Sequence, residues 1–151
     1  MLAQALKPGA DLDLLDATAR ALAPSAERLG ETLDQGAALA RTLAGITDRP
    51  LPARALPVAL GEAARPLGVP AATVIALYLQ AFAGNLVTIA VRHMPLGQTD
   101  GQRVLARLAP VVATLAARAA DSGLEDLGGA ALSGDLAAME HETQDVRIFR
   151  T

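Results

Sequence analysis

The feature that most constrains this chain is its longest apolar stretch, "VPAATVIALYLQAFAGNLVTIAV", which runs from Val69 to Val91. The stretch is as long as a membrane-crossing helix, which needs about 20 apolar residues. Two amide side chains, Gln80 and Asn85, lie in its interior, and neither a Trp nor a belt of Tyr flanks it. We therefore expect the buried central helix of a helical bundle rather than a membrane span.

The composition favours the same fold class. Hydrophobic residues make up 52% of the 151-residue chain, whereas aromatic residues make up 2%. The core must therefore form by close packing of helices that are rich in Ala, Leu and Val. A chain of this length suits one globular domain. We predict a single all-α bundle over residues 1–151, with a loop and an extended tail over residues 121–151.

Apolar residues at three- and four-residue steps mark the individual helices. Asp11 and Ser25 are each placed to cap the helix that follows, and Pro57 and Pro70 suit first turns. Helices are expected over residues 11–23, 25–44, 57–65 and 70–92, from 99 onward, and over a short stretch from 135 to 142.

Two residues inside these helices carry specific predictions. Gly84 lies in the middle of the long apolar helix, where glycine costs about 1 kcal/mol relative to Ala, so we expect another helix to cross there. Pro110 removes an interior hydrogen bond and should kink or divide its helix. The apolar stripe of that helix, which we expect to face the core, is Val104, Leu108, Val111 and Leu115.

Charge and motif content exclude several function classes. The net charge is -3, and Lys7 is the sole lysine, so no basic field suited to nucleic acid is present. With no Cys, thiolate chemistry and disulfides are excluded. The sequence has no GxxxxGK[ST] phosphate loop and no HExxH zinc motif. The first residues lack the apolar run of a secretory signal, so we expect a cytoplasmic protein.

One polar segment interrupts the apolar sequence: "GQTDGQR", from Gly97 to Arg103. Thr99 or Asp100 can accept a hydrogen bond from the first turn of the following helix, which is a structural interpretation of the segment. That interpretation leaves Gln98, Gln102 and Arg103 without a structural task. These side chains can face a partner as readily as water.

The histidines raise two further hypotheses. Asp100 could act as a base with His93 or His141 as its acid partner, but no spacing in the sequence brings such a pair together. His141 lies between Glu140 and Glu142, and such ligands suit nickel or zinc, although one chain offers few of them. We favour His93 as a helix-end or interface residue and His141 as a tail contact. We predict no catalytic residue, metal ligand or cofactor.

The end of the chain, "RIFR", places Ile148 and Phe149 between Arg147 and Arg150. A solvated tail is the simplest interpretation. An apolar anchor flanked by Arg also suits partner binding, because the anchor supplies contact area and Arg supplies directional hydrogen bonds.

Three segments together resemble a known family. They are "LPVALGEAARPLGVP", "YLQAFAGNLVTIAVRHMPLGQTDGQRVL" and "MEHETQDVRIFRT", in that order. The sequence PLGQTDGQR, followed by HETQ and RxFR, is the most specific part. On these motifs the chain resembles the urease accessory protein UreF family.

The resemblance implies an all-α, dimeric adaptor that is not itself an enzyme. Members of the family join UreD, also called UreH, and recruit the GTPase UreG, so that nickel reaches apo-urease. The resemblance makes one polar segment a structural and UreG-facing element: Gln98, Thr99, Asp100, Gln102 and Arg103. It implies that the tail orders against UreD, through His141, Glu142, Thr143, Gln144, Arg147, Phe149 and Arg150. The alternative is a small metal-binding chaperone that contacts nickel through His93 or His141.

The resemblance does not extend over the family's whole domain. Family members usually begin with a further helical region that contains an SP-x-LP-x-G-x-F-type motif, and this chain lacks that motif. Because such a region is expected to contribute to the core, its absence predicts exposed apolar surface.

Overall fold

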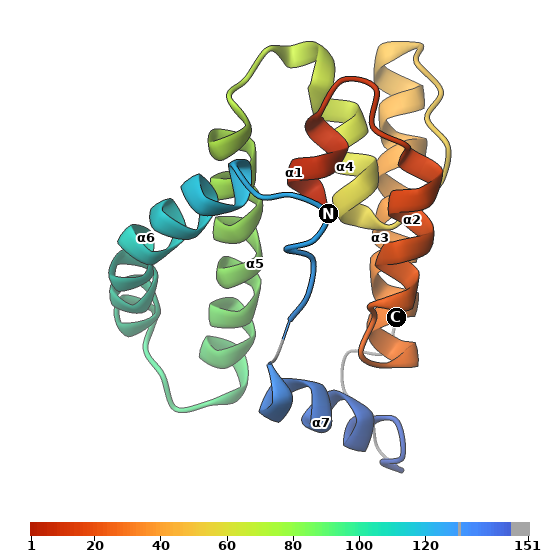
Figure 1. The fold of residues 1–151 in the computed structure, drawn as a ribbon. Helices are drawn as coiled ribbons and strands as arrows, with labels where there is room; N and C mark the ends of the chain where they lie inside the picture. Colours follow the sequence, from red (N-terminus) through yellow and green to blue (C-terminus); the bar gives the residue numbers. More distant parts are fainter. Residues whose placement is uncertain (130, 146–151) are drawn as a thin grey trace. The chain divides into compact units, whose positions relative to one another are not determined.

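The computed structural model describes residues 1–129 and 131–145, and these residues form helices and loops without a strand (Figure 1). The all-α prediction is therefore confirmed. The α-helices are α1 (Leu2–Leu6), α2 (Leu12–Ala21), α3 (Ala26–Thr47), α4 (Leu56–Ala64), α5 (Ala71–His93), α6 (Gln98–Ala120) and α7 (Leu132–His141). A short 3-10 turn, Arg65–Leu67, follows α4.

The helices form two compact units. The first contains Met1–Pro66 and the described residues from Gly123 on, so it holds α1 to α4 and α7. The second contains Leu67–Ser122, which is the hairpin of α5 and α6. A single domain over residues 1–151 stays a prediction, and each unit is described by itself.

The core of the first unit is built from small side chains. Ala5, Leu15 and Val58, from α1, α2 and α4, are buried together. Helices α1 and α4 approach so closely that a Cβ added at Gly61 would lie 2.5 Å from the Cβ of Ala5. At Gly36 on α3, an added Cβ would lie 1.8 Å from the carbonyl oxygen of Arg54. The described part of the first unit is therefore closely packed without aromatic rings, as the composition predicts.

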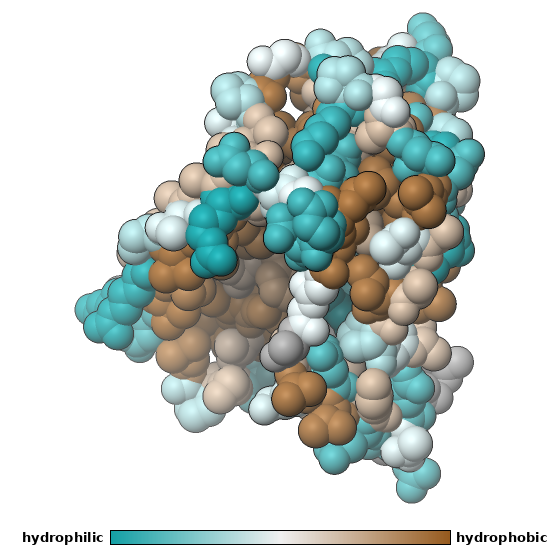
Figure 2. All heavy atoms as spheres, in the orientation of Figure 1, coloured by the Kyte–Doolittle hydropathy of each residue, from teal (hydrophilic) through white to brown (hydrophobic). Residues whose placement is uncertain are grey.

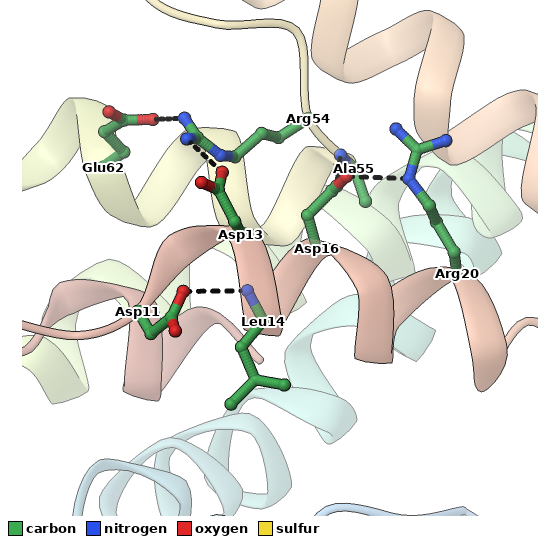
Figure 3. A network of polar contacts seen from close by, with 8 residues as sticks. All are labelled: Asp11, Asp13, Leu14, Asp16, Arg20, Arg54, Ala55 and Glu62. Atoms are coloured by element: carbon green, nitrogen blue, oxygen red, sulfur yellow. Dashed lines mark hydrogen bonds and ion pairs between the residues drawn. The ribbon is translucent and has the colours of Figure 1, made fainter.

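Both predicted helix caps in the first unit are confirmed. The Asp11 carboxylate accepts a hydrogen bond from the Leu14 N–H at 2.9 Å (Figure 3), and the Ser25 hydroxyl accepts one from the Arg28 N–H at 3.2 Å. Each bond satisfies an amide of the first turn that has no partner within its helix. The first turns of α2 and α3 are thus fixed by residues adjacent in sequence.

A polar network joins α2, α4 and the loop before α4 (Figure 3). The Arg54 guanidinium lies between Glu62 on α4, at 2.7 Å, and Asp13 on α2, at 2.8 Å. Asp16 accepts a hydrogen bond from the Ala55 N–H at 2.6 Å. Burial opposes the charge of Arg54, but the hydrogen bond with Asp13 and the charge of Glu62 outweigh it and raise the Arg54 pKa. The side chain of Arg54 is 12% exposed, so the network orders the loop from within.

In the second unit, α5 and α6 pack closely at Gly101. A Cβ added there would lie 2.8 Å from Cγ2 of Val91 and 3.0 Å from Cγ1 of Val87. At Gly84, by contrast, an added Cβ would meet nothing within 4 Å. The prediction of a helix crossing at Gly84 is therefore wrong. The close contact uses Gly101, which lies near the start of α6.

The prediction that α5 is a buried central helix is also wrong. The helix is long and apolar enough to span a membrane by length and composition alone, with a mean hydropathy of 1.9, yet only 11% of its most apolar window is buried. It packs against α6 along one side and leaves large apolar side chains exposed: Leu77, Phe82, Leu86 and Ile89. One neighbouring helix covers only part of such a surface.

The expected core stripe of α6 is likewise mostly exposed. Val104, Val111 and Leu115 are exposed, because the side of α6 that meets α5 carries the small buried residues Gly101 and Ala116 instead. The helix continues through Pro110, so the proline does not divide it. Pro110 and Ala106 both lie on exposed positions, where water can hydrate the carbonyl that loses its hydrogen bond.

Candidate partner-binding surface

The GQTDGQR segment forms the start of α6. Gly97 is the N-cap residue, and the cap has no side-chain hydrogen bond. The interpretation of Thr99 or Asp100 as the cap is therefore wrong, because α6 begins at Gln98 and both residues lie inside its first turn. Asp100 still places a negative charge where the helix dipole favours one.

The polar side chains of this segment are all exposed: Gln98, Thr99, Asp100, Gln102 and Arg103. Asp100 and Arg103 form an ion pair at 2.6 Å across one turn of the helix. Exposed pairs of this kind contribute about 0–1 kcal/mol, so this pair adds little to stability. Gly101 is needed for the packing of α6 against α5. The side-chain amides of Gln98 and Gln102 and the Arg103 guanidinium are exposed, so they can donate hydrogen bonds to another protein.

The tail residues His141 and Glu142 are held against the start of α3. Nδ1 of His141 lies 2.6 Å from a carboxylate oxygen of Glu27, and the Glu142 carboxylate accepts a hydrogen bond from the Glu27 N–H at 3.2 Å. A carboxylate at this position also complements the positive end of the α3 dipole. These contacts fix the end of α7 to the start of α3.

Glu27 organises this cluster, and the sequence gives little sign of it. It is separated from His141 by 114 residues, so no local pattern joins the two. Its place two residues after the Ser25 cap is the one available signal, because backbone amides at a helix start attract carboxylates such as Glu142.

The remaining tail residues make local bonds or fall outside the description. The Thr143 hydroxyl donates to the Glu140 carbonyl at 2.9 Å, and the Gln144 N–H donates to the His141 carbonyl at 3.2 Å. Both side chains are exposed. Arg147, Phe149 and Arg150 lie outside the described residues. The two predicted groups belong to different compact units, with Gln98 to Arg103 in the second and His141 to Gln144 in the first.

The two residues considered as an acid–base pair each contact another residue. Asp100 contacts Arg103 in the second unit, and His141 contacts Glu27 in the first unit. Across the described part of the chain, no group of three His, Asp or Glu side chains is arranged to hold a metal ion.

Comparison with known proteins assigns the family. The sequence model of the UreF family matches residues 1–109, which include the whole GQTDGQR segment. The chain belongs to the UreF family. The urease accessory protein UreF of Cereibacter sphaeroides is 61% identical over all 151 residues, which span 71% of that protein. The relatives of the same name from Jannaschia sp. and Paracoccus denitrificans are 54% and 50% identical over 151 residues, spanning 69% and 70% of their lengths.

UreF membership supports a role in urease maturation, as an accessory protein that interacts with other urease accessory proteins. The alignments with these three relatives cover the entire chain, so the tail is matched as well as the helices.

Proposed function

We propose that the chain is a non-catalytic adaptor in urease maturation. In this proposal it binds UreD, also called UreH, and recruits the GTPase UreG, so that nickel is delivered to apo-urease during GTP-dependent assembly. It works in the cytoplasm as a homodimer and carries no cofactor of its own. Membership of the UreF family is the observation that supports this proposal most strongly.

The start of α6 is the proposed contact for the GTPase. Its exposed side chains offer both hydrogen-bond donors and acceptors, and Arg103 adds a positive charge on a rigid helix. An adaptor transmits nucleotide state if the GTPase binds it more tightly in one state than in another. We therefore place the difference in affinity at Gln98, Thr99, Asp100, Gln102 and Arg103.

Charge reversal at Arg103 tests this contact. Arg103→Glu removes the donor and places a like charge beside Asp100, while the exposed position leaves the helix able to form. We expect UreG capture in a pull-down to fall at least tenfold with helix content unchanged. Arg41→Glu, an exposed charge reversal on α3, is the matched control. Equal capture by both variants would reject the assignment.

The tail is the proposed contact for UreD. His141 and Glu142 bond to Glu27 at the start of α3, and these contacts fix the end of α7 from which the tail continues. Truncation of Glu142 to Thr151, or Phe149→Ala alone, should weaken UreD capture more than it changes thermal stability. Ile46→Ala, which shortens an exposed apolar side chain at the end of α3, serves as the control. Unchanged capture by the soluble truncated chain would exclude this role.

A further inference from the structure

A cavity of about 230 Å³ lies beside the loop that joins α1 to α2. Side chains from α1, from this loop, from α2 and from the segment after α6 line it, among them Gln4, Lys7, Asp11, Leu14, Leu15 and Leu124. All of these residues belong to the first unit. The cavity takes no part in the two contacts of the proposed function, which lie at the start of α6 and in the tail.

The wall that α2 contributes is apolar. Leu15 is 2% exposed, so it closes the cavity on the inside, whereas Leu14 and Leu124 are 54% and 53% exposed. Figure 3 shows the Leu14 side chain extending away from the side of α2 that carries Asp13 and Asp16. Figure 2 shows hydrophobic residues at the surface over this helix. An apolar group that enters the cavity covers both half-exposed leucines, and their removal from water favours binding.

The size of the cavity selects the kind of group that it can take. An apolar cavity of about 150 Å³ holds a benzene molecule, whereas sites for drug-sized ligands measure about 300–1,000 Å³. A cavity of about 230 Å³ therefore suits one bulky side chain of a bound peptide, such as Phe or Leu. Gln4, which is 5% exposed, adds to the wall an amide that has both donors and an acceptor, as a peptide backbone requires.

Acidic side chains border the cavity. Asp11 lines it, and Glu125 and Asp126 directly follow Leu124. The carboxylates of Asp11 and Asp126 accept hydrogen bonds from backbone N–H groups, at 2.9 and 2.8 Å, which hold them in place without neutralising them. Among the described residues, none of the three acids forms an ion pair. Lys7 is the basic residue among those that line the cavity, so the border is negative on balance.

We propose that this cavity binds a short basic segment of a partner protein. One aromatic or aliphatic side chain of the segment enters between Leu14, Leu15 and Leu124, and its flanking Arg or Lys side chains face the three acids. The anchor supplies most of the affinity, because a buried apolar side chain in a fitted pocket dominates such contacts. The acids select a basic segment, because like charges at the border repel an acidic one.

The test measures binding of a labelled peptide, acetyl-Arg-Arg-Phe-Arg-Arg-amide, to the full chain by fluorescence anisotropy. Replacing the Phe of the peptide by Ala, or each of its Arg residues by Glu, should weaken binding by about tenfold or more. In a chain labelled at its leucine methyl groups, the Phe peptide should shift the NMR signals of Leu14, Leu15 and Leu124.

Variants of the chain locate the site. Leu124→Ala shortens a half-exposed side chain, and Glu125→Lys reverses an exposed charge, so both should leave helix content unchanged. Each should weaken binding of the Phe peptide by about fivefold or more. Leu132→Ala on α7 and Asp34→Lys on α3 are the matched controls, because both positions are exposed and neither lines the cavity. These controls should bind the peptide as the unaltered chain does.

Four results would overturn the proposal. They are no binding of the Phe peptide, equal binding of the Phe and Ala peptides, full binding by Leu124→Ala, and methyl shifts confined to leucines outside the cavity. Equal binding of the two peptides would indicate attraction by charge alone. Because neither UreD nor UreG is present, each of these failures leaves the proposed recruitment of those proteins standing.

Discussion

Two glycines of the hairpin make the sharpest stability test, because one substitution meets space and the other meets a neighbouring helix. Both Gly84 and Gly101 lie inside α-helices, so replacement by Ala raises helix propensity by about 1 kcal/mol at each. At Gly84 the new methyl group meets nothing within 4 Å. Gly84→Ala should therefore stabilise the hairpin by about 0.5–1 kcal/mol.

At Gly101 the methyl group would lie 2.8 Å from Val91 and 3.0 Å from Val87, two branched side chains with little freedom to move. Overpacking of this kind costs about 1–3 kcal/mol. Since the propensity gain is common to both variants, the difference between their free energies of unfolding should equal the overpacking cost. Gly101→Ala should therefore be less stable than Gly84→Ala by about 1–3 kcal/mol.

Urea unfolding followed by circular dichroism measures this difference, and hydrogen exchange of the α5 and α6 amides assigns it to the hairpin. For a chain of this size, 1 kcal/mol corresponds to about 2–4 °C in Tm. Equal stabilisation by the two substitutions would refute the close packing of α6 on α5 at Gly101. A loss of stability at Gly84 would show that this position is covered after all.

Two further predictions concern the first unit. Arg54→Met should destabilise it by about 2–4 kcal/mol, because the Glu62 carboxylate, 18% exposed, loses its charged partner, and adding Glu62→Gln should recover part of the loss in urea unfolding. Glu27→Gln weakens the contact with Nδ1 of His141, so limited proteolysis should cut the segment after α7 faster, while the helix content stays within a few per cent; an unchanged cleavage rate would contradict the role of this contact.

Local chemistry in the sequence predicted much of the fold. Asp11 and Ser25 cap their helices as expected, because a cap depends on residues three positions away. The exposure of α5 could not be predicted in the same way, because it depends on which surfaces of the helices meet. The side of α6 that contacts α5 carries the small residue Gly101, and the larger apolar stripe of α6 lies elsewhere.

For the candidate site, the structure bears on the exposure of the residues and on their contacts within the chain. Gln98, Gln102 and Arg103 are exposed, as the interpretation of a partner-facing segment requires. The cap is Gly97 instead of a side chain, because α6 begins one residue before Thr99. Glu27 was overlooked, because it meets His141 only through the tertiary fold.

Urease activation in cells that express apo-urease, UreD and UreG, with and without this chain, tests the adaptor role directly. Without the chain, we expect that UreD no longer captures UreG and that urease contains little nickel and little activity. Restoring the chain should recover all three. Normal capture, nickel content and activity in its absence would contradict the adaptor role.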